Sequence, residues 1–336
     1  MPSRVPIPYM KNILRFLIVT AASALLILPS TAAEPKRVIV CTVTTGFRHS
    51  SIPYAEKTLQ KLADETHLFT IVDYARQPEG QPARKPNKPA DLKPDADDKA
   101  KAKYEADLKK YNDDLAKYDP NAQSKFDAAI KESLSKLSPQ NLAAQKIDGV
   151  IFANTTGDLP LPDRDGFVKW VEDGHAFMAM HSGSDTFHGF PGYLDMLQGE
   201  FAGHNAQVSV DLVVADQANP ATKDLPSTWN LNQEEMYHIK RQDRSKVHSL
   251  VYLRHDPNKK EELGFFPVAW CREAGKGRVF YTSLGHREDL WSDDPNLRDR
   301  KNSVDMAKQY QQHILGGIKW ALGLAEGSAQ PNPDVK

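Results

Sequence analysis

Cysteine is scarce in this chain of 336 residues, which contains only Cys41 and Cys271. Two cysteines exclude a scaffold held together by disulfides and a zinc site built from cysteine ligands. Positive charge is not in excess either, because 43 Lys and Arg residues stand against 44 Asp and Glu residues. A nucleic-acid-binding protein needs a basic face that displaces counterions, so the charge balance argues against nucleic acid as a partner. Apolar residues make up 40% of the chain, enough for the core of one large or two modest domains.

Long apolar runs are also missing, with one exception at residues 16–28. Lys11 and Arg15 precede this run, and small residues ending at Ala33 follow it. A basic region, a short apolar core and small residues before a cleavage point predict a signal peptide over residues 1–33. The run is shorter than the roughly 20 residues that a membrane span needs, so an uncleaved anchor is the less favoured alternative. We therefore expect an exported protein, periplasmic or extracellular, with no membrane span after cleavage.

Short apolar segments alternate with helical patterns in the first half of the chain. Residues 38–43 and 148–153 are apolar almost throughout, as buried strands are. Alternation of such strands with helices predicts a parallel sheet covered by helices. Later segments predict alternating strands, a β-hairpin over residues 266–283 and a closing helix over residues 304–322. The other elements expected in the first half are a helix at 52–65, a strand at 68–73, a helix at 164–173 and a strand at 175–180.

Residues 76–137 interrupt this pattern with a segment rich in Lys, Asp, Ala and Pro. Within it, residues 99–118 place Tyr and Leu at alternating spacings of four and three, which forms a narrow heptad-like stripe. We interpret the segment as an inserted, solvated helix that packs on its own domain, with a partner-binding arm as the alternative. Residues 34–326 are then a single α/β domain that carries this insertion, and residues 327–336 are a tail. The sequence leaves the oligomeric state open.

Polar residues follow the predicted parallel strands at the points where these strands end. His49 follows the first strand, and His181 with Ser182 follows the fourth. Thr156 and Asp158 follow the third strand. Ligands of an open α/β sheet bind beyond the carboxyl ends of its parallel strands, so we expect these side chains at one edge. Later turns add further candidates, which are His188, His204, Glu235, Tyr237 and His286.

Histidine and carboxylate groups of this kind support two chemical interpretations. They could act without a metal as general acid and base on a polyol, with His286 as one of the catalytic groups. Alternatively, they could bind a divalent metal ion, although the spacings form no compact motif such as HExxH. A purely structural cluster of hydrogen-bonded residues is the third interpretation, and no cofactor other than a metal ion is expected. The expected metal ligands are His49, His181, His204 and Glu235.

Ser182 stands where a strand is predicted to pass through a sharp turn into a helix, the layout of a nucleophile elbow. It could act as a nucleophile with a neighbouring histidine as base. The sequence MHSGS lacks the glycine that lies two places before the serine in such elbows, so a serine hydrolase is a minor hypothesis. The full set of catalytic candidates is His49, His181, Ser182, Glu235 and His286.

Several short motifs lie in a fixed order along the chain. They are TGFRHS at 45–50, TTGD at 155–158, MHSGSDTF at 180–187, GEFAGH at 199–204, EEMY at 234–237 and GH at 285–286. Over about residues 36–76 and 137–324 the chain resembles the trehalose-utilisation (ThuA-like) family. This resemblance implies a class I glutamine amidotransferase-like fold, a flavodoxin-like three-layer sandwich. The patterns above add a mostly parallel sheet, a C-terminal β-hairpin and a helical insertion, and the insertion at about residues 76–137 departs from the simplest family pattern, as does the export signal. Amidotransferases carry a cysteine nucleophile at the place of His181, so glutamine hydrolysis is not expected here.

The resemblance further implies a role in carbohydrate breakdown. We expect an exported carbohydrate-active enzyme, a hydrolase or lyase, that acts on a trehalose-like disaccharide or its 3-keto form. A sugar oxidoreductase that makes keto sugars is the implied functional partner. A non-catalytic sugar-binding or assembly protein with the same pocket is the alternative class. Contacts with the sugar, by hydrogen bonds or by aromatic stacking, are expected from Phe47, Thr156, Asp158, His188, Tyr237 and Trp291.

Overall fold

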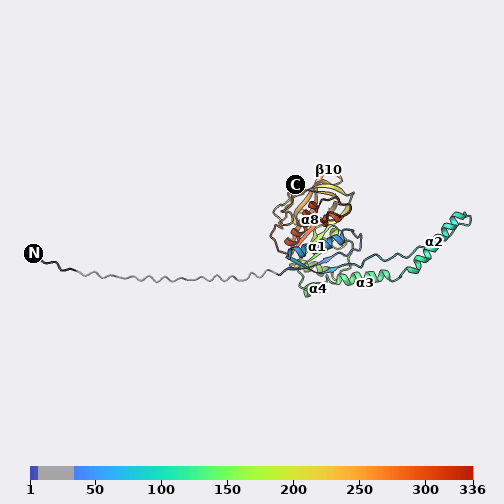
Figure 1. Cartoon of the computed structure of the whole chain (residues 1–336), viewed down its shortest axis with the longest axis horizontal. Helices are drawn as coiled ribbons and strands as arrows, with labels where there is room; N and C mark the ends of the chain where they lie inside the picture. Colours follow the sequence, from blue (N-terminus) through green and yellow to red (C-terminus); the bar gives the residue numbers. More distant parts are fainter. Residues whose placement is uncertain (7–33, 336) are drawn as a thin grey trace. The chain divides into compact units, whose positions relative to one another are not determined.

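The structure is a computed structural model that describes residues 1–6 and 34–335 (Figure 1). Most of the predicted signal peptide, residues 1–33, lies outside the described residues. Pro35–Lys336 form one unit of contacts, and the account below concerns that unit alone. Across the described part of the chain, none of the helices combines the length and the apolar content that crossing a bilayer requires.

One half of the central sheet is parallel. Its strands, in spatial order, are β2 (Phe69–Ala75), β1 (Lys36–Cys41), β3 (Gly149–Ala153), β4 (Ala176–Met180) and β11 (Gly277–Thr282). β3 and β4 are buried at every residue, because neighbouring strands flank them and helices cover both of their faces. The carboxyl ends of β1, β3 and β4 therefore lie side by side at one edge of the sheet.

The other half of the sheet is antiparallel. It adds β10 (Lys259–Ala274), β9 (His248–Asp256), β6 (Val208–Val214) and β7 (Thr228–Glu234), in this spatial order, to give nine strands among the described residues. β10 and β11 pair antiparallel around a turn at Gly275, whose φ of +60° favours glycine. The expected mixed α/β fold with a large, mostly parallel sheet is confirmed. A separate two-stranded sheet joins β5 (Glu200–His204) and β8 (Tyr237–Lys240).

Helices cover both faces of the sheet. On one face, α1 (Ile52–Thr66) and α8 (Val304–Ala321) pack against the strands. Leu59 of α1 and Ile318 of α8 are fully buried in the same cluster as Val40 of β1. The opposite face carries α3 (Ala122–Ser135), α4 (Pro139–Ala144), α5 (Arg164–Glu172) and α6 (Pro191–Leu197).

The insertion is helical, as predicted, but its two longest helices differ in how they pack. α3 buries Ile130 and Leu134 in the core of the domain. α2 (Asp98–Lys117) contributes no buried side chain, and Figure 1 shows it beyond the layers of the sheet. The hydroxyl of Tyr104 in α2 lies 3.4 Å from a carboxylate oxygen of Asp91, in the extended segment before the helix. Of these two helices, α3 alone therefore contributes to the core.

We expect that replacing residues 83–118 with a short Gly-Ser linker will change the free energy of unfolding by less than about 1 kcal/mol. The reason is that α2 has no buried side chain, so its loss removes little hydrophobic stabilisation. Urea denaturation of both proteins measures the difference. Ile130→Ala is the contrasting variant, because that buried side chain should cost about 2–5 kcal/mol. A comparable loss in the linker protein would contradict the prediction.

His313 of α8 is a fully buried titratable group outside the cluster of residues at the strand ends. Its Nδ1 lies 2.8 Å from the carbonyl oxygen of Ala221, to which the neutral ring donates. The ring packs against Trp229 and Phe280. Burial lowers the pKa of His313 from 6.5 to about 4, so the folded protein keeps this ring neutral under mildly acidic conditions.

The pKa of His313 predicts a loss of stability in acid. Between pH 6.5 and about pH 4 the unfolded chain binds a proton at this ring and the folded chain does not. The folded state therefore loses about 3 kcal/mol from this group as the pH falls through that window. His313→Gln retains a donor for Ala221 but does not titrate, so its unfolding free energy should change less with pH. Urea midpoints at about pH 7 and about pH 4.5 measure this, and equal pH dependence in both proteins would refute it.

Candidate active site

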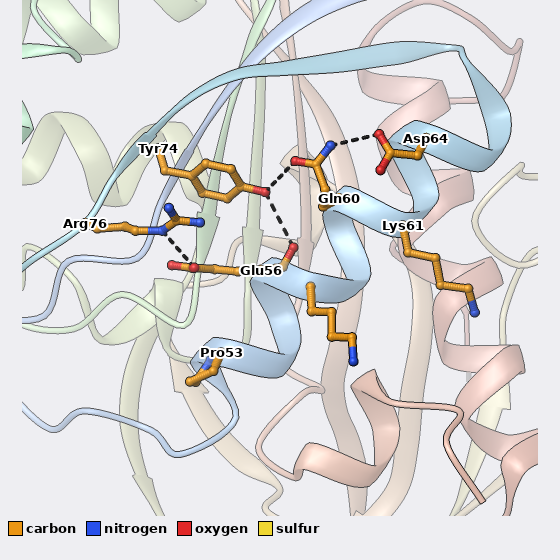
Figure 2. A pocket seen from close by; sticks show the side chains of 8 residues that line it. Pro53, Glu56, Gln60, Lys61, Asp64, Tyr74 and Arg76 are labelled. Atoms are coloured by element: carbon orange, nitrogen blue, oxygen red, sulfur yellow. Dashed lines mark hydrogen bonds and ion pairs between the residues drawn. The ribbon is translucent and has the colours of Figure 1, made fainter. Parts of the chain in front are cut away.

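A cavity of about 500 Å³ lies beside α1 and the end of β2, but it has little reactive chemistry (Figure 2). Glu56 and Arg76 form an ion pair of 2.8 Å, and the Tyr74 hydroxyl lies 3.0 Å from Gln60 Oε1. Its lining contains no histidine or cysteine. The polar groups of this cavity largely satisfy one another, so the strand ends are the better candidate for the site.

The carboxyl ends of β3 and β4 both turn through a left-handed residue. Asn154 follows β3 with a φ of 57°, and His181 follows β4 with a φ of 46°. His181 opens a 3-10 turn over His181–Asp185, and its carbonyl oxygen accepts a hydrogen bond of 2.8 Å from the Tyr281 hydroxyl. The sharp turn directs the His181 side chain toward His49, which follows β1.

Three imidazoles and one carboxylate converge at this edge of the sheet. Nε2 of His181 lies 3.2 Å from Nε2 of His49 and 3.6 Å from Oε2 of Glu235. Nδ1 of His286 lies 3.2 Å from the same Glu235 oxygen. One potential ligand atom from each of these four residues lies within 4.8 Å of the other three. The hydroxyl of Tyr237 lies 2.8 Å from His181 Nε2.

Hydrogen bonds behind two of the rings decide which nitrogen faces the cluster. Nδ1 of His181 lies 2.8 Å from the carbonyl oxygen of Ser283, which can only accept, so the neutral ring carries its proton there. Nδ1 of His49 lies 3.3 Å from the hydroxyl of Ser182. When His49 donates this proton to Ser182, both Nε2 atoms present lone pairs 3.2 Å apart. Two such lone pairs repel each other unless a proton or a metal ion lies between them.

Burial and neighbouring charges give the four groups different protonation states. Burial lowers the pKa of His49 to about 3, and the nearby rings of His181 and His286 add to the effect. Burial also lowers the pKa of His181. Against the effect of its own burial, the adjacent rings of His181 and His286 hold the pKa of Glu235 well below its ordinary value. The pKa of His286 is raised because Glu235 and Glu234 outweigh its burial.

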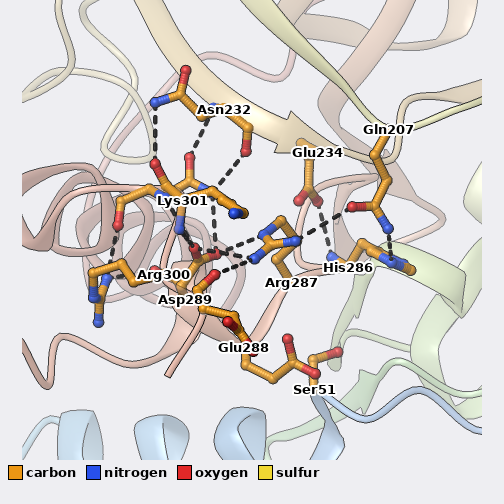
Figure 3. A network of polar contacts seen from close by, with 12 residues as sticks. Ser51, Gln207, Asn232, Glu234, His286, Arg287, Glu288, Asp289, Arg300 and Lys301 are labelled. Carbon is orange, nitrogen blue, oxygen red and sulfur yellow. Dashed lines mark hydrogen bonds and ion pairs between the residues drawn. The ribbon is translucent and has the colours of Figure 1, made fainter. Parts of the chain in front are cut away.

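A second carboxylate, Glu234 at the end of β7, holds the loop that carries His286 (Figure 3). Its Oε1 accepts the backbone N–H of Gly285 at 2.8 Å and that of His286 at 2.9 Å. Complete burial raises the pKa of Glu234 to about 7. On the far side of the ring, Gln207 Nε2 lies 2.8 Å from His286 Nε2, and Arg287 donates to Gln207 Oε1. The structure therefore fixes His286 by both its backbone and its outer ring nitrogen.

The four-group cluster borders a cavity of about 340 Å³, within the range of roughly 300–1,000 Å³ that is common for small-molecule sites. Aromatic side chains lie beside the titratable groups, and Phe47 at the rim is 68% exposed. Apolar ring faces next to convergent polar groups suit a ligand with both C–H and hydroxyl surfaces. The residues that line the cavity are Phe47, His49, Asp185, Phe201, His204, Glu235, Tyr237 and His286.

Four of the six expected sugar-binding residues lie outside this lining, and for three of them the structure shows another role. Trp291 is fully buried and donates its indole N–H to a carbonyl of the His286 loop at 2.8 Å, so it cannot stack on a sugar. Thr156 is also buried, and its hydroxyl donates to the carbonyl of Phe47 at 2.8 Å. The carboxylate of Asp158 pairs with Arg164 at 2.8 Å. The prediction of substrate contacts by Trp291, Thr156 and Asp158 has no support in this geometry.

Two further candidates lie one layer behind the cavity. Ser182 is fully buried and does not line the cavity, whereas His49, to which it hydrogen-bonds, does. Its hydroxyl is therefore placed to orient an imidazole rather than to attack a substrate. His188 is also absent from the lining, and its Nε2 lies 2.7 Å from a carboxylate oxygen of Asp185.

The geometry also changes the expected set of metal ligands. His204 lines the cavity, but its Nδ1 lies 3.1 Å from Oε1 of Glu235, the oxygen that does not face His286. His286 takes the fourth place in the compact cluster with His49, His181 and Glu235. These four residues could hold a metal ion, with His204 supporting the carboxylate from the other side.

Sequence reasoning missed four residues that shape the site. Asp185 and Phe201 line the cavity. They belong to the MHSGSDTF and GEFAGH motifs, so their closeness in sequence to His181 and His204 could have indicated them. Glu234 and Glu235 are adjacent in the EEMY motif, and sequence alone does not show which of the two side chains holds a neighbouring loop. Gln207 carried no signal, since a polar residue before a strand is common.

The sequence and the fold of this chain are each similar to those of known proteins. A family model described as trehalose utilisation, ThuA, matches residues 37–321. A ThuA-like protein from Parabacteroides merdae is 15% identical with a TM-score of 0.55, and the match covers 90% of this chain and 99% of that one. A ThuA-like protein from Bacteroides uniformis is 16% identical with a TM-score of 0.53, with 90% and 98% covered.

At these identities the two structures support a shared fold and no more. The search of curated proteins found no match. The family model, by contrast, extends from β1 to the last residue of α8 and so includes all the strands and every residue of the four-group cluster. The chain therefore belongs to the trehalose-utilisation (ThuA) family.

Proposed function

We propose that this protein is an exported carbohydrate-active enzyme that breaks down a trehalose-like disaccharide or its 3-keto form as a hydrolase or lyase. The family gives the proposal its carbohydrate role. The observation that carries the enzymatic part is the cluster of His49, His181, Glu235 and His286 beside a ligand-sized cavity. Recognition of hydroxyl groups alone does not need three imidazoles within 4.8 Å of one carboxylate.

The donor set fits a divalent metal ion. Imidazole nitrogen and carboxylate oxygen are ordinary ligands of zinc and of related transition metals. The facing lone pairs of His49 and His181 fit such an ion, and His286 Nδ1 lies 3.2 Å from the Glu235 oxygen of the same group. When bound, a metal ion would polarise a substrate oxygen or lower the pKa of a water molecule.

The other side chains that line the cavity are placed to contact a sugar directly. His204 is 42% exposed in its side chain and contacts Glu235, so its ring can exchange a proton with a sugar hydroxyl. The Tyr237 hydroxyl lies 2.8 Å from His181 Nε2, and it can donate to a bound sugar when a metal ion occupies that nitrogen. Phe47 and Phe201 offer apolar faces to the C–H surface of a pyranose ring. A sugar oxidoreductase would be the class of enzyme that supplies a 3-keto substrate.

Metal analysis followed by turnover assays tests the proposal. Purified protein should contain close to one equivalent of a divalent metal and should convert trehalose, sucrose or one of their 3-keto forms. A chelator should remove the metal and the turnover together. Absence of metal and of turnover, with retained affinity for a sugar, would instead support the non-catalytic sugar-binding class.

Export is tested separately. Protein recovered from the periplasm or medium should begin after Ala33 when its N-terminus is sequenced. A mature chain that begins at Met1 or Met10 would contradict cleavage.

A further inference from the structure

We propose that Asp185, which lines the cavity but is not part of the four-group cluster, binds two adjacent hydroxyl groups of a sugar ring. The inference rests on the proposed function, in that the ligand of the cavity is a sugar. Asp185 ends the 3-10 turn that His181 begins, and it lines the same cavity as Glu235. It lies outside the group of four residues that could hold a metal ion, so its carboxylate remains available to a ligand.

A network of ion contacts holds the Asp185 carboxylate in place. Its Oδ1 lies 2.7 Å from Nε2 of His188, and Nδ1 of the same ring lies 2.8 Å from Oε1 of Glu200. Glu200 is 4% exposed in its side chain and also pairs with Lys240 at 3.1 Å and Arg241 at 2.7 Å. Both ring nitrogens of His188 are thereby used, so the ring cannot rotate without losing two contacts.

His188 lies between two carboxylates, those of Asp185 and Glu200. Burial acts to lower the pKa of His188, but Glu200 and Asp185 outweigh it and raise the pKa. Burial acts to raise the pKa of Glu200, but His188 and Lys240 outweigh it and lower the pKa. A protonated His188 between two carboxylates donates to both, and it leaves Oδ2 of Asp185 with no partner among the side chains that the structure describes.

The exposure of Asp185 points to a ligand rather than to a structural role. Its side chain is 27% exposed, compared with 4% for Glu200, which contacts the other ring nitrogen of His188. A carboxylate with two oxygens side by side matches the spacing of two neighbouring hydroxyl donors, and hydrogen bonds to a charged acceptor are the stronger kind. The cluster of imidazoles can then act on one part of the sugar while Asp185 fixes the orientation of another.

Asp185→Asn tests the inference, with Asp158→Asn as the matched control. Asp158 pairs with Arg164 and does not line the cavity, so its amide variant keeps the fold and leaves the cavity unchanged. Titration calorimetry with trehalose should give a dissociation constant about 10-fold to 100-fold weaker for Asp185→Asn and unchanged for Asp158→Asn. Metal content and thermal unfolding should be the same in all three proteins.

Monodeoxy analogues of trehalose separate a direct contact from an indirect one. The unaltered protein should lose affinity for the analogue that lacks a contacted hydroxyl, and Asp185→Asn should bind that analogue and trehalose about equally. His188→Gln should show a smaller loss of the same selectivity. Equal affinity of Asp185→Asn and the unaltered protein, or an equal loss for every analogue, would overturn this inference alone. Failure of the unaltered protein to bind any saccharide would overturn the proposed function as well.

Discussion

Replacing His181 with asparagine is expected to remove the bound metal ion and to reduce turnover by a factor on the order of 10²–10⁴. His181 Nε2 contacts His49, Tyr237 and Glu235 at once, so no other ring is as central to the cluster. Asparagine is preferable to alanine because the backbone at this position has a φ of 46°, which asparagine adopts more readily. Mass spectrometry for metal content and rates with the sugar substrate measure both effects.

His255→Asn is the matched control for this prediction. His255 lies in β9, outside the cavity, with its Nδ1 3.0 Å from the carbonyl oxygen of Asp256. The control should retain metal and turnover. A His181→Asn protein that is folded and keeps its full metal content would reject the metal site. Full turnover in the same protein would reject a catalytic role for the cluster.

Asp289→Ala is expected to cost about 3–5 kcal/mol of folding free energy, as the loss of one partner from a buried charged network does. Asp289 is 1% exposed, and its carboxylate accepts the backbone N–H groups of Lys301 and Asn302 (Figure 3). It also accepts from the Asn302 side chain and from Arg287, which follows His286. Denaturation in urea measures the loss, and turnover should fall with it because the His286 loop loses its support.

Asp293→Ala tests whether burial is the cause of that cost. The carboxylate of Asp293 forms an ion pair of 2.6 Å with Lys61, and the two side chains are 29% and 35% exposed. A pair of this exposure is expected to contribute about 0–1 kcal/mol. Similar losses in the two variants would contradict the account of the Asp289 network.

The position of the site could be predicted from sequence because parallel strands place their ends together. β1 and β4 each pair with β3, so the residues that follow them, His49 and His181, had to lie at one edge. The identity of the fourth group could not be predicted in the same way. His204 and His286 both follow glycine, but His204 ends β5 of the separate two-stranded sheet and reaches Glu235 Oε1, whereas His286 follows β11 and reaches Oε2.

Trp291 shows the limit of reasoning from residue type. A tryptophan near a glycine-histidine turn suggested a stacking platform, but a large aromatic side chain is also the best filler for a core. In the structure Trp291 packs edge-on against Tyr310 of α8 at 5.1 Å between ring centroids. The short helix α7 (Glu288–Trp291) turns this side chain inward, and no local pattern in the sequence specifies that direction.

The pairing of β4 with β11 sets the order in which the protein can mature. The register of the two strands joins Met180 to Thr282, so a long stretch of chain must be in place before this ladder closes. Contacts between residues far apart in the sequence form slowly, because the intervening chain loses conformational entropy before the contacts stabilise the fold. The group of His49, His181, Glu235 and His286 is therefore incomplete in a nascent chain until the segment that carries His286 has joined the sheet.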